Sequence, residues 1–408
     1  MSLFLVDSLN KNKVSYQILL EDLSKENNSF YPYLHSTDTY LIFKNLLIGL
    51  LSENDVVLLD SDFSKEEVAK MLGNYDKTKS AIPVSLKFDS HQTILDKLKE
   101  TKSNIGLFTS GTTGTPKLIN HNLNVFRKSV RIGERYENHI WGFAYNPTHM
   151  AGLQVFFQAF FNQNLIVKIF GLKNQETLGL LNKYQISHLS ATPTFYRLLS
   201  INEPLDFVRR ITFGGEKSGE ALYGKMKKGF PNAKINNIYA TTEFGTLFIS
   251  DGDAFKPSTE NKDLVKIEDN LLWVHKSLLG MNQDAPVLVA DWYCTNDKVE
   301  VLSNNPLKFK FLSRVSSTVN IGGYNVDPKE TEDVLLTYPG VKIARVFAKA
   351  NRVLGNMLRA EAVAETGVEL SEKEMLDFLK SKLQAHKLPR IIKIVDEVKL
   401  TRTGKIKQ

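Results

Sequence analysis

The sequence predicts an α/β protein with a large N-terminal domain of helix and strand layers and a small α+β domain at the C-terminus. From Asp38 onward, runs with helical and strand patterns alternate, which is typical of parallel sheets with crossover helices. The chain from Asp327 onward instead reads as two helices and three strands in α+β order. At 408 residues, the chain is long enough for two domains.

The first predicted elements lie ahead of the strongest chemical motif. Residues 1–35 are rich in lysine and asparagine, and within them only residues 14–20 read as the opening of a helix. Residues 41–51 then predict a helix, and residues 56–59 predict a buried strand. Residues 64–67 form a capping box, which predicts that another helix begins there. The expected result is a parallel sheet with crossover helices.

The composition is that of a soluble globular protein, with 42% apolar and 24% charged residues. The net charge of +7 mildly favours polyanionic ligands, but no basic block interleaved with aromatic residues indicates nucleic acid. The best apolar run, residues 40–51, is short and contains Lys44. We therefore expect a core helix there and no membrane span.

Cysteine and histidine usage narrows the possible chemistry. The single cysteine, Cys294, excludes an intramolecular disulfide and a multi-cysteine metal site. It also suits a reducing compartment, so we expect a cytoplasmic protein. We expect no signal peptide, because the N-terminus lacks a basic region followed by an apolar core. The eight histidines are scattered, and no Gly-x-Ser-x-Gly elbow supports a serine hydrolase.

Residues 104–117 carry the strongest chemical signal of the chain. An apolar run that reads as a buried strand leads into Ser-Gly-Thr-Thr-Gly-Thr-Pro-Lys. Glycines let backbone N–H groups approach an anion, hydroxyls add donors, and Lys117 adds a mobile positive charge. The segment therefore predicts a cradle for a polyphosphate. It is not the P-loop of kinases and GTPases, because Leu118 follows the lysine.

This segment resembles the phosphate loop of the acyl- and aminoacyl-adenylate-forming superfamily. Its members are acyl-CoA synthetases, adenylation domains of peptide synthetases, and luciferases. The resemblance runs from about Asp38 to the end of the chain and implies two domains, 1–313 and 314–408, with a shortened first subdomain. It implies that the phosphates of ATP are held by Ser110, Gly111, Thr112, Thr113, Gly114 and Lys117.

Residues 235–245 resemble the family's Asn-x-Tyr-Gly-x-Thr-Glu segment. A triphosphate needs Mg²⁺, which takes few protein carboxylates beside waters and phosphate oxygens, and Glu243 fits that ligand role. The resemblance further implies that Thr242 serves the α-phosphate. It also implies that Tyr239 stacks on adenine and that Asn237 bonds the edge of the base.

Two further segments resemble parts of the family's nucleotide site. Residues 211–217 read as a strand ending in a glycine pair, and the resemblance places the turn at Gly215 and Glu216 against adenine. A later segment looks like the family's Trp-Tyr-x-Thr-Gly-Asp and ends at Asp297. A carboxylate there can accept bonds from both ribose hydroxyls. Arg314 matches an arginine that reaches the ribose and phosphate.

Residues 146–153 precede a predicted apolar helix that runs through Phe161. The segment looks like the family region where an aromatic side chain or a histidine borders the acyl pocket. His149 is then expected to gate that pocket and touch the substrate carboxylate. A structural histidine in a loop is the alternative. Residues 186–194 read as a strand, a turn and the start of a helix, similar to the family's Val-Pro-Thr segment.

The C-terminal part resembles the mobile domain of the family. Residues 313–324 are similar to the hinge between the two domains, with Ser316 at the hinge position. Gly323 matches the glycine that lines the channel for the pantetheine thiol. The tail is similar to the family's Thr-x-Ser/Thr-Gly-Lys motif, whose lysine drives adenylation, and this lysine is Lys405.

The resemblance implies an ATP-dependent acid–thiol ligase. A carboxylic acid and ATP would give acyl-AMP and pyrophosphate, and the C-terminal domain would then swing so that a thiol attacks the adenylate. Coenzyme A is the expected thiol, and the phosphopantetheine arm of a carrier protein is the alternative. A nucleotide-binding protein without turnover also stays open, because the chain departs from the family pattern at Leu118, Asn296, Ser313, Ser317 and Lys399.

The acid itself is only coarsely indicated. The pocket candidates are mostly aromatic and predict an apolar substrate, fatty or aromatic: His149, Phe156, Phe213, Tyr239 and Phe244. Adenylation domains of peptide synthetases usually carry an aspartate that pairs with the substrate amine. No such aspartate can be placed here, which disfavours amino acids.

Overall fold

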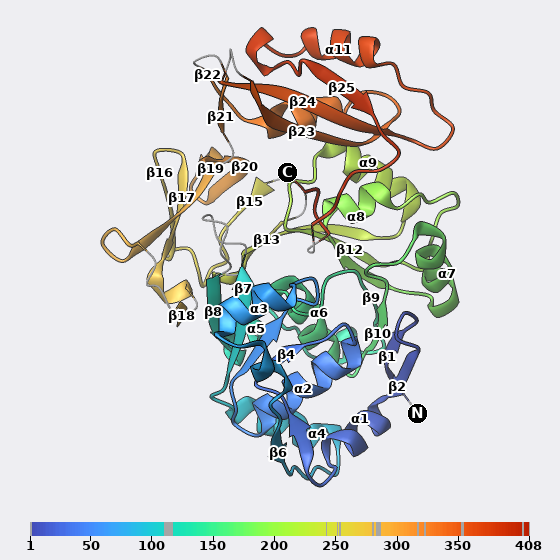
Figure 1. The fold of residues 1–408 in the computed structure, drawn as a ribbon, viewed down its shortest axis with the longest axis vertical. Coiled ribbons are helices and arrows are strands. Elements are labelled where there is room, and N and C mark those ends of the chain that lie inside the picture. Colours follow the sequence, from blue (N-terminus) through green and yellow to red (C-terminus); the bar gives the residue numbers. More distant parts are fainter. Residues whose placement is uncertain are drawn as a thin grey trace.

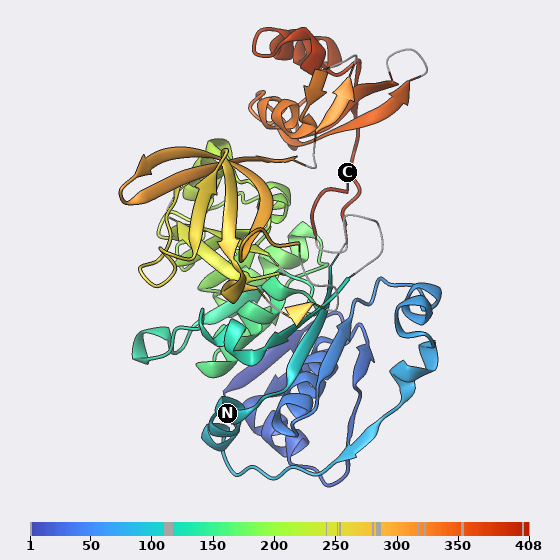
Figure 2. The same cartoon turned by 90° about the vertical axis from the view of Figure 1, so that its left-hand side faces the viewer.

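In the computed structural model, three large sheets and a two-stranded one form the larger N-terminal part, and a smaller unit lies at the C-terminus (Figure 1). The structure describes residues 2–109, 117–241, 243–250, 252, 254–279, 281–282, 287–315, 318–321, 324–351, 355–401 and 404–407. Figure 2 shows the C-terminal unit, in orange and red, standing apart from the blue and green layers, while the end of the chain returns toward them.

The central sheet has the strand order β14-β13-β12-β11-β9-β10-β1-β2. Its inner strands are parallel, and the edge strands β2 and β14 are antiparallel to their neighbours. The carboxyl ends of the parallel strands therefore share one edge, where open α/β sheets bind ligands. The strands are β1 Leu3–Asp7, β2 Asn12–Ser15, β9 Ile140–Phe143, β10 Leu165–Lys168, β11 His188–Ala191, β12 Arg210–Gly214, β13 Lys234–Thr241 and β14 Gly245–Ser250.

Helices cover both faces of this sheet, and their bounds are α1 Tyr16–Leu23, α6 Met150–Phe161, α7 Asn174–Tyr184, α8 Pro193–Leu198 and α9 Glu220–Gly229. Successive strand residues point to opposite faces. Leu189 and Ile211 consequently pack with α7, α8 and α9 in one core. Phe143 packs with α6 in the other core, which continues into the first subdomain.

The first subdomain contains a second sheet with the order β18-β8-β7-β5-β4. Its strands are β4 Tyr33–His35, β5 Val56–Leu59, β7 Asn104–Thr109, β8 Lys117–Asn122 and β18 Met281–Asn282. A separate two-stranded antiparallel sheet is formed by β3 Asn28–Phe30 and β6 Ile82–Val84. Its helices are α2 Thr39–Leu51, α3 Lys65–Leu72, α4 His91–Glu100 and α5 Leu123–Arg127. The predicted helix and buried strand are confirmed as α2 and β5. The capping box is also confirmed, because the side chains of Ser64 and Glu67 each accept a hydrogen bond from the other's backbone N–H group.

Two parts of the N-terminal region differ from the sequence expectation. Residues 14–15 belong to β2, and the predicted helix begins only at Tyr16. β1 also joins the central sheet beside β10, although its surroundings showed little pattern.

A third large sheet, which the sequence analysis did not predict, is antiparallel and comes after β14 in the chain. Its strands are β15 Ala254–Phe255, β16 Val265–Glu268, β17 Leu271–His275, β19 Trp292–Asn304 and β20 Leu307–Arg314.

The C-terminal unit is α+β, as predicted. Its elements are β21 Val319–Ile321, β22 Tyr324–Val326, α10 Pro328–Leu335, β23 Val341–Asn351, β24 Gly355–Ala364, α11 Glu372–Lys380 and β25 Ile391–Ile394. Asp327 and Ser371 cap α10 and α11 through their side chains. A domain boundary between residues 313 and 314 stays a prediction. Within the described residues, no helix is both long and apolar enough to cross a membrane.

Candidate active site

A cleft with a volume of about 3070 Å³ joins the carboxyl edge of the central sheet, the antiparallel sheet and the C-terminal tail. It brings together candidate residues that are far apart in the sequence: Lys117, His149, Gly215, Glu216, Asn237, Tyr239, Glu243, Asp297, Arg314 and Lys405. The other candidates lie outside the described residues: Ser110, Gly111, Thr112, Thr113, Gly114, Thr242, Ser316 and Gly323.

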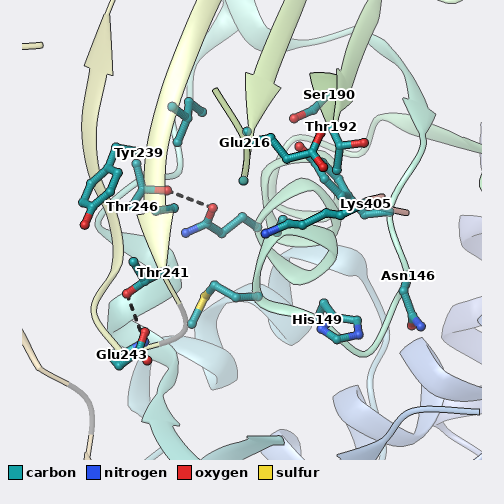
Figure 3. A pocket seen from close by; sticks show the side chains of 18 of the residues that line it. Asn146, His149, Ser190, Thr192, Glu216, Tyr239, Thr241, Glu243, Thr246 and Lys405 are labelled. Carbon is teal, nitrogen blue, oxygen red and sulfur yellow. Dashed lines mark hydrogen bonds between the residues drawn. The ribbon is translucent and has the colours of Figure 1, made fainter. Parts of the chain in front are cut away.

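A tight turn in the tail presents Lys405. The backbone N–H of Thr401 donates to the carbonyl of Lys405 at 2.6 Å, and the Lys405 N–H donates to Thr401 Oγ1 at 3.2 Å. Gly404 completes the turn with a φ of +72°, which glycine adopts without strain. Because these bonds use only the backbone of Lys405, its side chain is left to extend into the cleft toward Thr246 (Figure 3).

The large domain holds this turn against the end of the central sheet. Thr192 Oγ1 donates to the carbonyl of Gly404 at 3.2 Å. A Cβ placed on Gly215 would lie 3.1 Å from Lys405 Cε and 3.3 Å from its Nζ. Gly215 therefore leaves the space that the lysine side chain occupies, which gives this glycine a steric function as well as a positive φ of +82°.

Glu216 is the carboxylate fixed beside this lysine. Its Oε2 accepts hydrogen bonds from the backbone N–H of Thr194 at 2.9 Å and from Thr194 Oγ1 at 2.7 Å. Burial lowers the pKa of the Lys405 ammonium below its usual value, Glu216 opposes this shift, and Arg314 adds to it. An anion that binds beside Lys405 would stabilise its charged ammonium, because added negative charge favours the protonated form.

The antiparallel sheet contributes a second charged group to the cleft. Asp297 on β19 faces Arg314 on β20, and Arg314 Nε donates to Asp297 Oδ1 at 2.9 Å. The Tyr239 hydroxyl donates to Asp297 Oδ2 at 2.5 Å, while its ring stacks on Phe311 at a centroid distance of 4.2 Å. Tyr239, Asp297 and Arg314, which are expected to contact the adenine and the ribose, therefore form one connected group of side chains.

Glu243 places a carboxylate in the cleft that forms no hydrogen bond or ion pair with another described residue. Its backbone N–H donates to Thr241 Oγ1 at 3.2 Å, and the side chain is only partly buried. The described residues contain no cluster of three histidine, cysteine or acidic ligands. One available carboxylate suits Mg²⁺ that is held mainly by phosphate oxygens and waters.

Lys117 and Asn237 occupy two other parts of the wall. Lys117 begins β8 and pairs with Thr109, the last residue of β7. The two residues that flank the predicted phosphate loop, Thr109 and Lys117, therefore lie opposite each other in the sheet. Asn237 is buried, and its amide donates to Ser218 Oγ at 3.4 Å. The roles expected for Lys117 and Asn237 stay predictions.

His149 has a partner that the sequence analysis missed. It precedes α6, and its Nε2 lies 2.8 Å from Oδ2 of the buried Asp60. Asn146 Nδ2 donates to the other Asp60 oxygen at 3.1 Å. Asp60 directly follows β5, at the carboxyl end of a strand paired in parallel with its neighbours. That position was a usable signal, because such strand ends form ligand sites.

Three of the predicted aromatic pocket residues do not line the cleft, so that prediction was wrong. Phe156 is fully buried and stacks on Phe43 at 4.2 Å within the aromatic core. Phe213 points toward α8, where its ring lies 5.0 Å from that of Tyr196. Phe244 is 6% exposed and belongs to the core beneath the antiparallel sheet. Only His149 and Tyr239 of that set reach the cleft.

Comparison with known proteins agrees with this geometry. A family model described as AMP-binding enzyme matches residues 37–266, and one described as AMP-binding enzyme C-terminal domain matches residues 330–405. An oxalate–CoA ligase of Saccharomyces cerevisiae is 26% identical over 74% of this chain. A 2-succinylbenzoate–CoA ligase of Staphylococcus aureus is 22% identical over 93% of this chain and 82% of its own length.

The solved structures show the same fold. The crystal structure of ATP-bound MatB from Rhodopseudomonas palustris aligns with a TM-score of 0.74 at 15% identity, over 99% of this chain and 94% of that chain. This chain spans 61% of the length of the yeast oxalate–CoA ligase. The first family model covers more than half of the chain, and the second includes Lys405. The chain therefore belongs to the AMP-binding enzyme family.

Proposed function

We propose that the protein activates a carboxylic acid with ATP and then transfers the acyl group to coenzyme A. The observation that carries this proposal is the placement of Lys405, from the C-terminal tail, in one cleft with Glu243 and the Asp297–Arg314 pair. Such a cleft offers cations to phosphate oxygens and a carboxylate to Mg²⁺. It contains the charges that adenylation needs.

In the first step, an oxygen of the substrate carboxylate attacks the α-phosphorus of ATP. The bond from that phosphorus to the bridging oxygen of the β-phosphate breaks, which gives acyl-AMP and pyrophosphate. Charge gathers on phosphate oxygens during this displacement, so positioning and electrostatics supply most of the catalysis. Lys405 and Thr242 serve the α-phosphate, and Lys117 with its preceding loop serves the phosphates that leave.

Glu243 would hold Mg²⁺, which would supply positive charge to the phosphate oxygens. Tyr239 and the Gly215 turn border the adenine in this proposal, and Asn237 bonds its edge. Asp297 Oδ1 accepts one hydrogen bond, from Arg314, and keeps one lone pair for a ribose hydroxyl, because each carboxylate oxygen can accept two hydrogen bonds. Its Oδ2 already accepts from both Tyr239 and Arg314.

In the second step, the C-terminal domain turns about Ser316 so that the thiol sulfur can attack the acyl carbon. The thiol loses its proton, and AMP leaves. The described polar ties between the domains include the ion pairs Lys217–Asp333 at 2.8 Å and Lys225–Glu365 at 3.6 Å. Lys342 Nζ also donates to Ser200 Oγ at 2.8 Å, and Thr192 Oγ1 donates to the Gly404 carbonyl at 3.2 Å. Partly exposed pairs of this kind contribute about 0–1 kcal/mol each, so they do not lock the domain.

Coenzyme A is the preferred acceptor because two relatives are named as CoA ligases. A carrier protein with a phosphopantetheine arm is the alternative acceptor. Supplying preformed acyl-AMP with either thiol and measuring thioester formation separates the two. A cytoplasmic location is part of this proposal, because it supplies both ATP and coenzyme A.

The activation step is tested by acid-dependent exchange of labelled pyrophosphate into ATP. We expect exchange with a subset of a carboxylic acid library, in the presence of Mg²⁺ and without any thiol. Nucleotide binding with no exchange for any acid would contradict the proposal and favour a nucleotide-binding protein without turnover.

Replacing Lys117 by alanine should weaken ATP use more than AMP binding, because the lysine is assigned to the departing phosphates. A charge-assisted contact of this kind is worth about 1.5–3 kcal/mol, so the Kd for ATP should rise by about tenfold to a hundredfold. Calorimetry with ATP and AMP measures this difference. Lys128→Ala, an exposed lysine outside the cleft, is the control. Equal losses for both nucleotides would instead assign Lys117 to a part they share.

Asp60→Asn should lower kcat/KM for the acid by about tenfold and leave the KM for ATP unchanged, because the loss of one charged hydrogen bond frees His149 to turn. The isosteric change limits disturbance of the buried site. A double-mutant cycle checks the route: Asp60→Asn combined with His149→Gln should lose no more than His149→Gln alone. Additive losses would show that Asp60 acts without His149.

A further inference from the structure

The face of the central sheet that lies toward α6 is polar inside the cleft. Two lateral rows of side chains on this face follow from the strand register, and six of their members line the cleft. Phe143, which pairs with Ser190, lies instead in the core that α6 covers. The row nearest the amino ends of the strands contains Trp141, His188 and Arg210. The next row contains Ser190, Thr212 and Asn236. The apolar residues between these positions point to the other face, where they form a core.

The wall opposite this face is mixed, because Gln154 and Gln158 line it together with the apolar Met150, Ala151 and Val155. Gln154 of α6 lines the cleft and accepts a hydrogen bond from Thr246 Oγ1 at 2.8 Å. Its Nε2 is buried and has no hydrogen-bond partner among the described residues. An alkyl chain between these walls would leave polar groups unpaired, which costs free energy. The fatty acid expected from the sequence therefore fits this part of the cleft poorly.

Donors and positive charge gather where the cleft reaches the amino ends of the strands. Trp141 Nε1 and His139 Nδ1 are buried without a hydrogen-bond partner in the described structure. The rings of His139 and His188 stack at 3.8 Å. Arg210 is exposed at this end, and neither it nor Arg209 forms an ion pair with another described residue.

The histidines do not supply the positive charge at neutral pH. Burial, together with the nearby His139 and the two arginines, lowers the pKa of His188 to about 3. Burial also lowers the pKa of His139. Arg210 and Arg209 stay charged, because guanidinium groups do not lose their proton in proteins. This end of the cleft therefore combines neutral donors with permanent cations.

We propose that the acid activated by this protein carries a second carboxylate, which binds at Arg210 and Trp141 while the reacting carboxylate lies near Lys405. This inference rests on the proposed function. Arg210 and Gly214 are four positions apart on β12, which separates the two ends of the pocket by about 13 Å at a rise of ~3.3 Å per residue. The substrate class is thus a dicarboxylic acid whose two acidic groups stand at opposite ends, aliphatic or aromatic.

The test compares each dicarboxylic acid with its own monomethyl ester in pyrophosphate exchange. The probes are the straight-chain series from glutaric to sebacic acid, together with terephthalic acid. The ester keeps the length and one carboxylate but removes the second charge. We expect at least one diacid to give a kcat/KM about tenfold to a hundredfold above that of its ester, the range of a charged hydrogen bond.

Two variants assign this preference to residues. Arg210→Ala should lower kcat/KM for the preferred diacid by about tenfold to a hundredfold and leave the ester unchanged. Trp141→Phe keeps a ring in the core but removes the N–H donor, and should cause a smaller loss for the diacid only. Lys228→Ala, an exposed lysine of α9 outside the cleft, is the control for a lost charge.

The outcomes separate this inference from the proposed function. Exchange with monocarboxylic acids or esters that equals or exceeds exchange with every diacid would overturn the inference alone. Equal losses for diacid and ester in Arg210→Ala would also overturn it, because Arg210 would then support the fold. Absence of exchange with all acids would overturn the proposed function, and this inference with it.

Discussion

Glu243→Gln should slow acyl-AMP formation by about two to three orders of magnitude while leaving the fold intact. The substitution keeps the size of the side chain but removes the charge that Mg²⁺ requires. Charge stabilisation by a bound metal is worth several kcal/mol in a transition state, and each 1.36 kcal/mol changes the rate tenfold. The structure supports this assignment because the Glu243 carboxylate lines the cleft without a hydrogen-bond or ion-pair partner among the described residues.

The measurement is pyrophosphate release at saturating ATP over a range of Mg²⁺ concentrations. The variant should need more Mg²⁺ and should still bind AMP with normal affinity when a chelator is present. Glu260→Gln, an exposed glutamate outside the cleft, is the matched control. Near-normal activity with an unchanged Mg²⁺ requirement would remove Glu243 from the metal site.

Features that depend on neighbours in the sequence could be predicted. Ser64, Asp327 and Ser371 all cap helices as their spacing indicated, because a cap is formed by residues within one helical turn. The motifs ending at Glu243 and Lys405 were also informative. In each of them, several polar residues at fixed spacing match one proposed ligand chemistry.

Features that depend on strand partners could not be predicted from local patterns. Phe213 and Thr212 are adjacent in β12, yet only Thr212 faces the cleft, because strand side chains alternate. Which of the two faces meets α6 depends on the neighbouring strands. The contact between Asp60 and His149 likewise joins the end of β5 to the start of α6, which are brought together only by the fold.

The antiparallel sheet was missed for a related reason. Its longest strand, β19, contains the motif that ends at Asp297, and its pairing with β20 places Arg314 on the same carboxylate. The sequence analysis read these residues as two separate motifs. The register of one hairpin makes them a single group, which also reaches Tyr239.

Lys405→Ala should affect one half-reaction only. The Lys405 side chain lies beside Gly215 because the tail turn is held at Thr192, and this is the domain orientation that the proposed adenylation step uses. One contact that stabilises a developing charge is worth on the order of 3–4 kcal/mol, or roughly a hundred- to thousandfold in rate. Acyl-AMP formation should fall by about that factor. The turn itself should survive, because its hydrogen bonds use the backbone of residue 405.

Thiol attack on preformed acyl-AMP should stay close to the wild-type rate, because the proposed domain rotation has by then moved Lys405 away from the adenylate. Single-turnover kinetics of each half-reaction measures both rates on one purified variant. Lys399→Ala is the matched control, since this exposed lysine of the same tail lies outside the cleft and its backbone carbonyl bonds Lys407. Equal losses in both steps would contradict the rotation, and Lys405 would then act as a structural or general electrostatic residue in a single domain arrangement.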